Sequence, residues 1–159
     1  DNKNDYLPHN YEQNTIVYTG THDNDTSIGW YATATEHEKD HVRRYMNING
    51  ENIAWDLIRL AMSSTAVFSI FPMQDVLRLE SSYRMNTPSV ANGNWQFRFE
   101  LSHLKEEDAH GLYYLTELFN RLPQKKQQIE KQEVIAVEKQ QEKTQKQPNH
   151  TKKQKRKKR

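Results

Sequence analysis

The chain has 159 residues, of which 34% are apolar and none is cysteine. This length allows one domain of ordinary size, but the apolar fraction leaves little material for a complete core. The absence of cysteine excludes disulfide bonds and thiolate chemistry. No apolar run approaches the roughly 18 residues of a membrane span, and no export signal opens the chain, so we expect a soluble, cytoplasmic protein without a membrane partner.

The charge divides the chain into two unequal parts. Residues 1–124 carry 10 Lys and Arg against 17 Asp and Glu, whereas residues 125–159 carry 13 against 4. The second part is built from Lys, Gln and Glu, and such a composition cannot bury enough apolar surface to offset the entropy of ordering. We therefore predict a folded unit over 1–124 and a disordered, Lys/Gln-rich basic tail, or a fraying solvated helix, over 125–159.

The first predicted element is a short strand that ends beside polar residues. The segment "NTIVYTG", 14–20, is rich in β-branched and aromatic residues and stops at Gly20, which predicts a buried strand. His22 and Asp23 follow in a loop, and in a parallel α/β fold this end of a strand is where chemistry occurs. Alternatively, Asp23 and Asp25 cap the next turn and His22 is a packed histidine. The segment "DND", 23–25, supplies oxygen ligands for a cation, but the glycine and the glutamate of an EF-hand loop are missing at the required positions. We therefore expect no metal.

Two helices and a second strand follow. Thr35 and Glu38 have the spacing of a capping box, which predicts a helix over 36–46. A second helix over 51–64 repeats apolar residues on one face that should pack on a sheet, and these are Ile53, Leu57, Leu60 and Ala61. The run "TAVFSIF", 65–71, then predicts a strand that is buried on both faces.

A long polar and aromatic segment, 72–99, comes after the second strand. It contains Pro88 and an Asn-Gly turn signal, and Trp95, Phe97 and Phe99 alternate with polar residues, as in a short strand or a packed ledge. Loops of this length are usually functional or disordered. A last helix is predicted within 104–122, although Gly111 weakens its first turns.

The basic tail ends in "KKQKRKKR", and the nearest aromatic residue is Phe119. Nothing in the tail offers a platform for base stacking or an element that reads a groove. We therefore predict weak, salt-sensitive attraction to any polyanion and no specific nucleic-acid partner.

Four blocks of the chain carry a resemblance to a known family. In this order, "YLPHNY", "NTIVYTGTHDNDTSIGWY", "FPMQDVL" and "RMNTPSVANGNWQFRF" resemble the C-terminal catalytic part of the 4-α-glucanotransferases, the amylomaltase or disproportionating-enzyme family. The resemblance covers the first three quarters of the chain. It implies an α/β fold, the C-terminal part of a (β/α)8 TIM barrel, in which the two predicted strands are the last two. A complete barrel takes about 250 residues, so we expect a fragment whose remaining barrel lies upstream.

The resemblance also implies an activity. Enzymes of this family transfer a segment of α-1,4-glucan to the 4-hydroxyl of glucose or another maltodextrin, with retention of configuration and without a cofactor. Retention requires a carboxylate nucleophile and a carboxylic acid about 5 Å apart, and in the family both lie upstream of this segment. We therefore expect the fragment alone to be inactive. The alternative is a non-catalytic remnant or a fragment that only binds glucan.

By the same resemblance, Asp23 is the third family carboxylate, a transition-state stabiliser, and His22 is its companion. An ionised Asp can accept hydrogen bonds from sugar hydroxyls and His can donate one, and both bonds strengthen as the ring becomes oxocarbenium-like. Asn86 resembles a substrate-contacting amide, or it holds a turn before Pro88. Trp95 either stacks on a sugar or packs.

The end of the second strand adds further candidates, and it departs from the family. Gln74 is expected to bind substrate, while its neighbour Asp75 could cap a short turn. The segment "RLE", 78–80, stands where the family has Gly-Leu-Gly, Tyr83 replaces a small residue and Ser89 replaces a common glycine. These changes predict an altered loop beside the acceptor site.

Overall fold

The structure is a computed structural model that describes residues 3–123, 132, 134, 135 and 137. Compact units extend over Asp1–Asn120 and Arg121–Arg159. The predicted disordered tail lies almost entirely outside the described residues. Its described members, Gln132, Val134, Ile135 and Val137, are helical and exposed. None of the described helices is long and apolar enough to cross a membrane.

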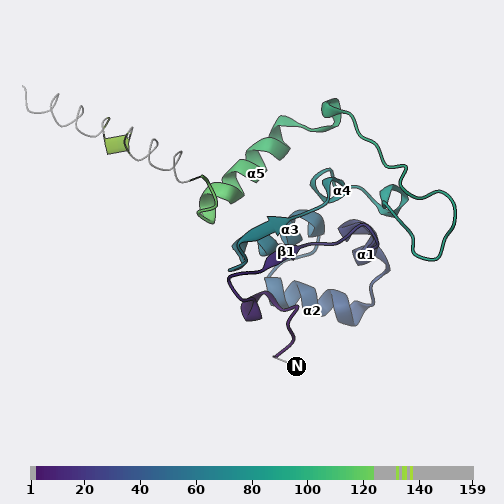
Figure 1. The fold of residues 1–159 in the computed structure, drawn as a ribbon. Helices are drawn as coiled ribbons and strands as arrows, with labels where there is room; N and C mark the ends of the chain where they lie inside the picture. The colour runs from purple at the N-terminus through teal and green to yellow at the C-terminus, as the bar shows by residue number, and fades with distance from the viewer. Residues whose placement is uncertain (1–2, 124–131, 133, 136, 138–159) are drawn as a thin grey trace, which may run out of the picture. The chain divides into compact units, whose positions relative to one another are not determined.

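The sheet of the first unit consists of two short parallel strands within the described part of the chain. Strand β1 (Ile16–Tyr18) pairs with β2 (Phe68–Ile70), so that Ile16 lies beside Phe68 and Tyr18 beside Ile70. The connection between them contains α1 (Ser27–Thr33), α2 (Glu36–Met46) and α3 (Ile53–Ser63) (Figure 1). The two predicted strands and the two longer helices are confirmed, but the predicted burial of the first strand holds only for Val17. Helix α1 was missed because its seven residues are too few to show a periodic apolar face.

The capping box that predicts α2 is present. The Thr35 hydroxyl accepts from the Glu38 amide at 3.3 Å, and the Glu38 carboxylate accepts from the Thr35 amide at 2.8 Å. The Thr35 hydroxyl also donates to the Glu38 carboxylate at 2.7 Å, and this bond, together with the bond from the Thr35 amide, lowers the pKa of Glu38. The helix ends where Asn47 adopts the left-handed conformation, with φ of 54°. Local sequence alone therefore defines both ends of this helix.

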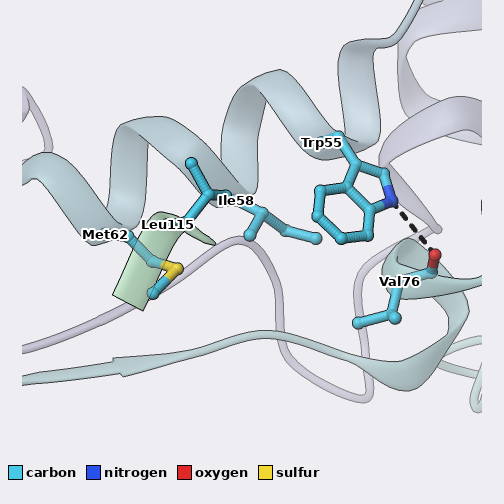
Figure 2. Close-up of a cluster of buried hydrophobic side chains, with 5 residues drawn as sticks. All are labelled: Trp55, Ile58, Met62, Val76 and Leu115. Atoms are coloured by element: carbon cyan, nitrogen blue, oxygen red, sulfur yellow. Dashed lines mark hydrogen bonds between the residues drawn. The ribbon is translucent and has the colours of Figure 1, made fainter. Parts of the chain in front are cut away.

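Helix α3 supplies most of the core, but its buried face differs from the predicted one. Of the predicted residues, Ile53 and Ala61 are buried, whereas Leu57 and Leu60 are only half-buried. The centre of the face is Ile58, which is fully buried. Figure 2 shows the core cluster around it, formed by Trp55, Ile58, Met62, Val76 and Leu115.

Two elements besides the sheet explain why the buried face of α3 differs from the predicted face. Helix α4 (Met73–Val76) contributes Val76, whose carbonyl accepts from the Trp55 indole N–H at 3.1 Å, and α5 (Glu106–Leu118) contributes Leu115. Contact with the sheet also exists, because Val17 packs with Ala61. The helix therefore packs on the sheet as predicted, and it also faces α4 and α5, which its own periodicity could not indicate.

The prediction that the second strand is buried on both faces is wrong. Ile16, Tyr18, Phe68 and Ile70 are 52–61% exposed and belong to the paired positions of the two strands. The opposite face carries Val17 against α3. The sheet has only two strands in the described part of the chain. A closed barrel is therefore not observed in these residues.

The segment after β2 is mostly irregular. It contains α4 and two short 3-10 helices, η2 (Ser81–Tyr83) and η3 (Leu101–His103). A third 3-10 helix, η1 (Pro8–Asn10), precedes β1. Of the two forms predicted for the aromatic segment, the short strand is not formed. Instead the rings of Phe97 and Phe99 stack, with centroids 6.1 Å apart, in the loop before α5. The predicted last helix is α5, and in the described part of the chain it ends at Leu118 rather than before Pro123.

Candidate active site

The loop after β1 places the His-Asp pair. The strand ends at Tyr18, and the Asn24 side chain accepts from the amide and the hydroxyl of Thr21 at 2.8 and 2.9 Å. The Asn24 amide donates back to the Thr21 carbonyl at 3.2 Å. This turn carries His22 and Asp23 out of the strand. On a strand, two adjacent side chains would point to opposite faces of the sheet. Because His22 and Asp23 lie in a turn, this restriction does not apply to them.

Asp23 and His22 meet Asn86, which comes from the irregular segment after α4. Asn86 Nδ2 donates to Asp23 Oδ1 at 2.6 Å, and the Asn86 amide donates to the His22 carbonyl at 3.1 Å. His22 Nε2 lies 3.4 Å from the same Asp23 oxygen, and both side chains are just over half exposed. Three of the predicted site residues are therefore in contact, although 63 positions separate Asp23 from Asn86.

The capping alternative for the acidic residues fits Asp25 only in part and does not fit Asp23. The N-cap of α1 is Thr26, whose hydroxyl accepts from the Gly29 amide at 3.1 Å. Asp25 accepts from the Thr26 amide at 2.7 Å and from the Ser81 hydroxyl at 2.6 Å. A Cβ on Gly29 would collide with Ser81, so α1 and η2 approach each other closely here. Asp25 thus joins these elements.

Trp95 lies beside the pair. Its ring centroid is 5.0 Å from that of His22, its amide donates to the Met85 carbonyl at 2.8 Å, and the residue is 54% exposed. The backbone of Trp95 is left-handed, with φ of 63°. The side chain therefore packs on His22 and leaves much of its surface open to a ligand. Packing and stacking on a sugar, the two roles considered for Trp95, are both compatible with this geometry.

Gln74 and Asp75, which lie on α4 after β2, are buried and make different contacts. Gln74 Nε2 donates to the Tyr83 carbonyl at 3.2 Å. Asp75, 2% exposed, accepts from the Thr19 hydroxyl at 2.7 Å and from the Ser27 amide and hydroxyl at 2.9 and 2.8 Å. Asp75 therefore does not cap α4. It joins both ends of the loop that carries the His-Asp pair.

Arg84 is a site residue that the sequence reasoning missed. It is half-buried, and its guanidinium donates to the carbonyls of Asp23 and Asn86 at 2.9 and 3.0 Å. Its position two residues before Asn86, inside the block "RMN", was the available signal.

A cleft of about 590 Å³ opens beside these residues. It is lined by the loop after β1, the end of β2 and the aromatic loop, including His22, Ile70, Gln74, Arg84, Trp95, Phe97 and Phe99. Asp25 is the only carboxylate among the described lining residues, and Asp23 lies next to the lining positions His22 and Asn24. No group of three or more His, Asp or Glu residues in the described part of the chain could hold a metal ion.

The backbone shows why glycine is expected at two of the positions where this chain departs from the resembled family. Arg78 and Ser89, at two of the expected glycine positions, have φ of 56° and 65°, in the left-handed region that favours glycine. The Arg78 guanidinium donates to the buried Asp108 at 2.6 Å and lies 4.8 Å from the centroid of the Trp55 ring. At Arg78, the backbone conformation is unfavourable for a residue other than glycine, but the side chain gains contacts that glycine could not make.

Comparison with known proteins gives consistent relatives. The family model for 4-alpha-glucanotransferase matches residues 1–103. A 4-alpha-glucanotransferase of Synechocystis sp. is 46% identical over 123 residues, covering 76% of this chain and 24% of the relative. That of Thermus thermophilus is 44% identical over 128 residues, covering 76% and 26%. The chloroplastic/amyloplastic protein of Solanum tuberosum is 52% identical over 103 residues, covering 64% and 18%.

A solved structure is similar as well. The amylomaltase from Streptococcus agalactiae in complex with acarbose superposes with a TM-score of 0.69 at 36% identity, covering 72% of this chain and 23% of that one. The chain therefore spans about a quarter of the length of the relatives it matches.

Proposed function

The chain belongs to the 4-alpha-glucanotransferase family, and from this premise we propose that its described residues form part of a retaining transglycosidase site. This site transfers a segment of α-1,4-glucan to the 4-hydroxyl of glucose or of another α-1,4-glucan. The observation that carries the proposal is the contact of Asp23 with His22 and Asn86 beside the cleft. The acarbose complex of the Streptococcus agalactiae amylomaltase supports a glucan as the ligand.

Asp23 is the transition-state stabiliser in this proposal. Its described contacts with Asn86 and His22 are both made through Oδ1, so we assign Oδ2 as the oxygen that accepts from a sugar hydroxyl. A fixed, ionised carboxylate accepts stronger hydrogen bonds from these hydroxyls as positive charge develops on the sugar ring. His22 lines the cleft with its Nε2 3.4 Å from Asp23 Oδ1, and it donates a hydrogen bond to the substrate.

The other cleft residues bind and orient the glucan. The exposed ring of Trp95, together with Phe97 and Phe99, offers apolar faces on which the C–H side of a sugar can pack. Gln74 lines the cleft while it fixes the Tyr83 carbonyl. Asn86 is not one of the described residues that line the cleft; it orients Asp23, and in this proposal it contacts the substrate near the cleavage point. No step requires a cofactor.

The nucleophile and the acid come from residues outside this chain. Retention needs two carboxyl groups that flank the scissile bond, and Asp25, the carboxylate among the described lining residues, is already bound by Thr26 and Ser81. The 159-residue chain alone is therefore inactive. The test is incubation with maltotriose, followed by analysis for glucose and longer maltodextrins. Turnover above a heat-inactivated control would contradict this statement.

A site variant tests the role of Asp23 in the complete transferase that carries this segment. Asp23→Asn keeps the shape and removes the anionic acceptor, so kcat should fall about a hundredfold or more with a smaller change in KM. Asp40→Asn is the matched control, because Asp40 is exposed on α2 and pairs with Arg44. An unchanged kcat for Asp23→Asn would refute the proposed role.

The second candidate is a non-catalytic fragment that binds glucan, and the cleft within the described residues is what favours it. Sequencing of the genomic region upstream distinguishes the two. A continuous reading frame that encodes the missing Asp and Glu supports the transferase. A start codon immediately before Asp1 supports the glucan-binding fragment.

A further inference from the structure

We propose that Arg84 is a positioning residue, which holds the backbone of Asp23 against the segment that carries Asn86. The inference rests on the proposed function, because it concerns how Asp23 is aimed. Arg84 Nη2 donates to the Asp23 carbonyl at 2.9 Å, and Arg84 Nε donates to the Asn86 carbonyl at 3.0 Å. One guanidinium thus joins two backbone segments that are 63 residues apart in sequence.

The chemistry of the guanidinium suits this task. It is planar, always charged, and presents its N–H donors in a fixed fork, so two carbonyls bound by it are held at a fixed separation. A lysine ammonium is a point charge on a flexible stem and does not impose that geometry. Neither acceptor of Arg84 is a carboxylate, so its described bonds fix backbone positions and do not occupy the carboxylate oxygens of Asp23.

Arg84 completes a set of bonds around the carboxylate. Asn86 donates through its amide to the His22 carbonyl and through its side chain to Asp23 Oδ1. The side-chain bond is short, but Asp23 is half exposed, so water competes for it. The bond persists only while the two backbones keep their relative position. Arg84, which is itself half-buried, fixes that position.

Hydrogen exchange of the full 159-residue chain tests the structural half of the proposal. In Arg84→Met, the Asn86 amide should exchange about tenfold faster or more, while amides of α3 such as Ile58 keep their rates. Arg84→Lys should not restore the protection. Arg98→Met is the matched control: Arg98 lines the same cleft, but it donates to Trp95 and Phe97 within its own loop. Unchanged exchange at Asn86 in Arg84→Met would overturn the proposal.

Kinetics of the complete transferase test the functional half. Arg84→Met should lower kcat about tenfold or more with KM changed less than about threefold, because a misaimed Asp23 weakens the transition state more than substrate binding. The double variant with Asp23→Asn should lose little beyond Asp23→Asn alone. A raised KM with unchanged kcat would assign Arg84 to substrate binding and overturn the proposal, as would additive losses.

The outcomes also separate this inference from the proposed function. If Asp23→Asn has full activity, the role of Asp23 in the proposed function fails, whatever Arg84 does. If Asp23→Asn is impaired and Arg84→Met is not, the positioning role of Arg84 fails alone. The exchange measurement needs no activity and stands in both cases.

Discussion

Replacement of Asp75 by Ala should destabilise the fold strongly, because this buried carboxylate joins three elements. Its oxygens accept from Thr19 after β1 and from the amide and hydroxyl of Ser27 at the start of α1. Asp75 is 2% exposed and Ser27 is 5% exposed. Water therefore cannot replace the lost acceptor without opening the structure.

The magnitude follows from these contacts. A buried amide left without its acceptor costs about 1–3 kcal/mol, and each hydroxyl that loses its partner costs about 0.5–1.5 kcal/mol. Asp75→Ala should therefore lower the free energy of unfolding by about 2–6 kcal/mol. Asp75→Asn keeps one oxygen acceptor, so we expect a smaller loss of about 1–2 kcal/mol. A folded unit of this size has a total stability of only about 6–18 kcal/mol.

Urea unfolding of the full chain, followed by tryptophan fluorescence, measures the effect. With an m-value of about 1.5 kcal/mol/M, the midpoint of Asp75→Ala should fall by about 1.3–4 M. Asp40→Ala is the control, because its exposed pair with Arg44 is worth about 0.5 kcal/mol or less. Equal midpoints for Asp75→Ala and Asp40→Ala would refute the role assigned to Asp75.

Four further predictions concern other parts of the chain. Arg78→Gly should relieve a left-handed backbone but leave the buried Asp108 unpaired, for a net loss of about 1–3 kcal/mol in urea unfolding; a more stable variant would contradict this. Gly111→Ala should lose about 1–2 kcal/mol despite better helix propensity, because its Cβ would lie 2.7 Å from the Trp55 ring; a gain would show that the ring yields. The pKa of Glu38 is lowered, so its stabilisation is complete above about pH 4.3 and is lost as the pH falls through the folded pKa. Glu38→Gln should therefore destabilise the chain at pH 6 and have little effect near pH 3, and an equal effect at both would refute this sign. The isolated basic tail should bind nucleic acids of any sequence at low salt and release them near physiological salt; selective binding that survives the salt would reveal a specific partner.

Local features of the fold could be predicted from the sequence because the interactions behind them are short in range. The Thr35–Glu38 capping box joins residues three apart, so its spacing is visible in the chain. The β-branched run that becomes β1 carries its own preference for extended backbone. The burial of α3 was predicted only in part, since its buried face depends on α4 and α5 as well as on the sheet.

The sequence by itself determined the family, the strand-end position of His22 and Asp23, and Asn86 as a separate candidate. Only the tertiary structure decided that Asp23 contacts Asn86, that Arg84 binds both backbones, and that Asp75 joins the two ends of the loop. Periodicity and spacing report a residue's neighbours along the chain, whereas these bonds join segments about 50 to 60 residues apart. The exposure of β2 has the same origin, because an apolar run states what a strand can bury and the neighbouring elements decide what it does bury.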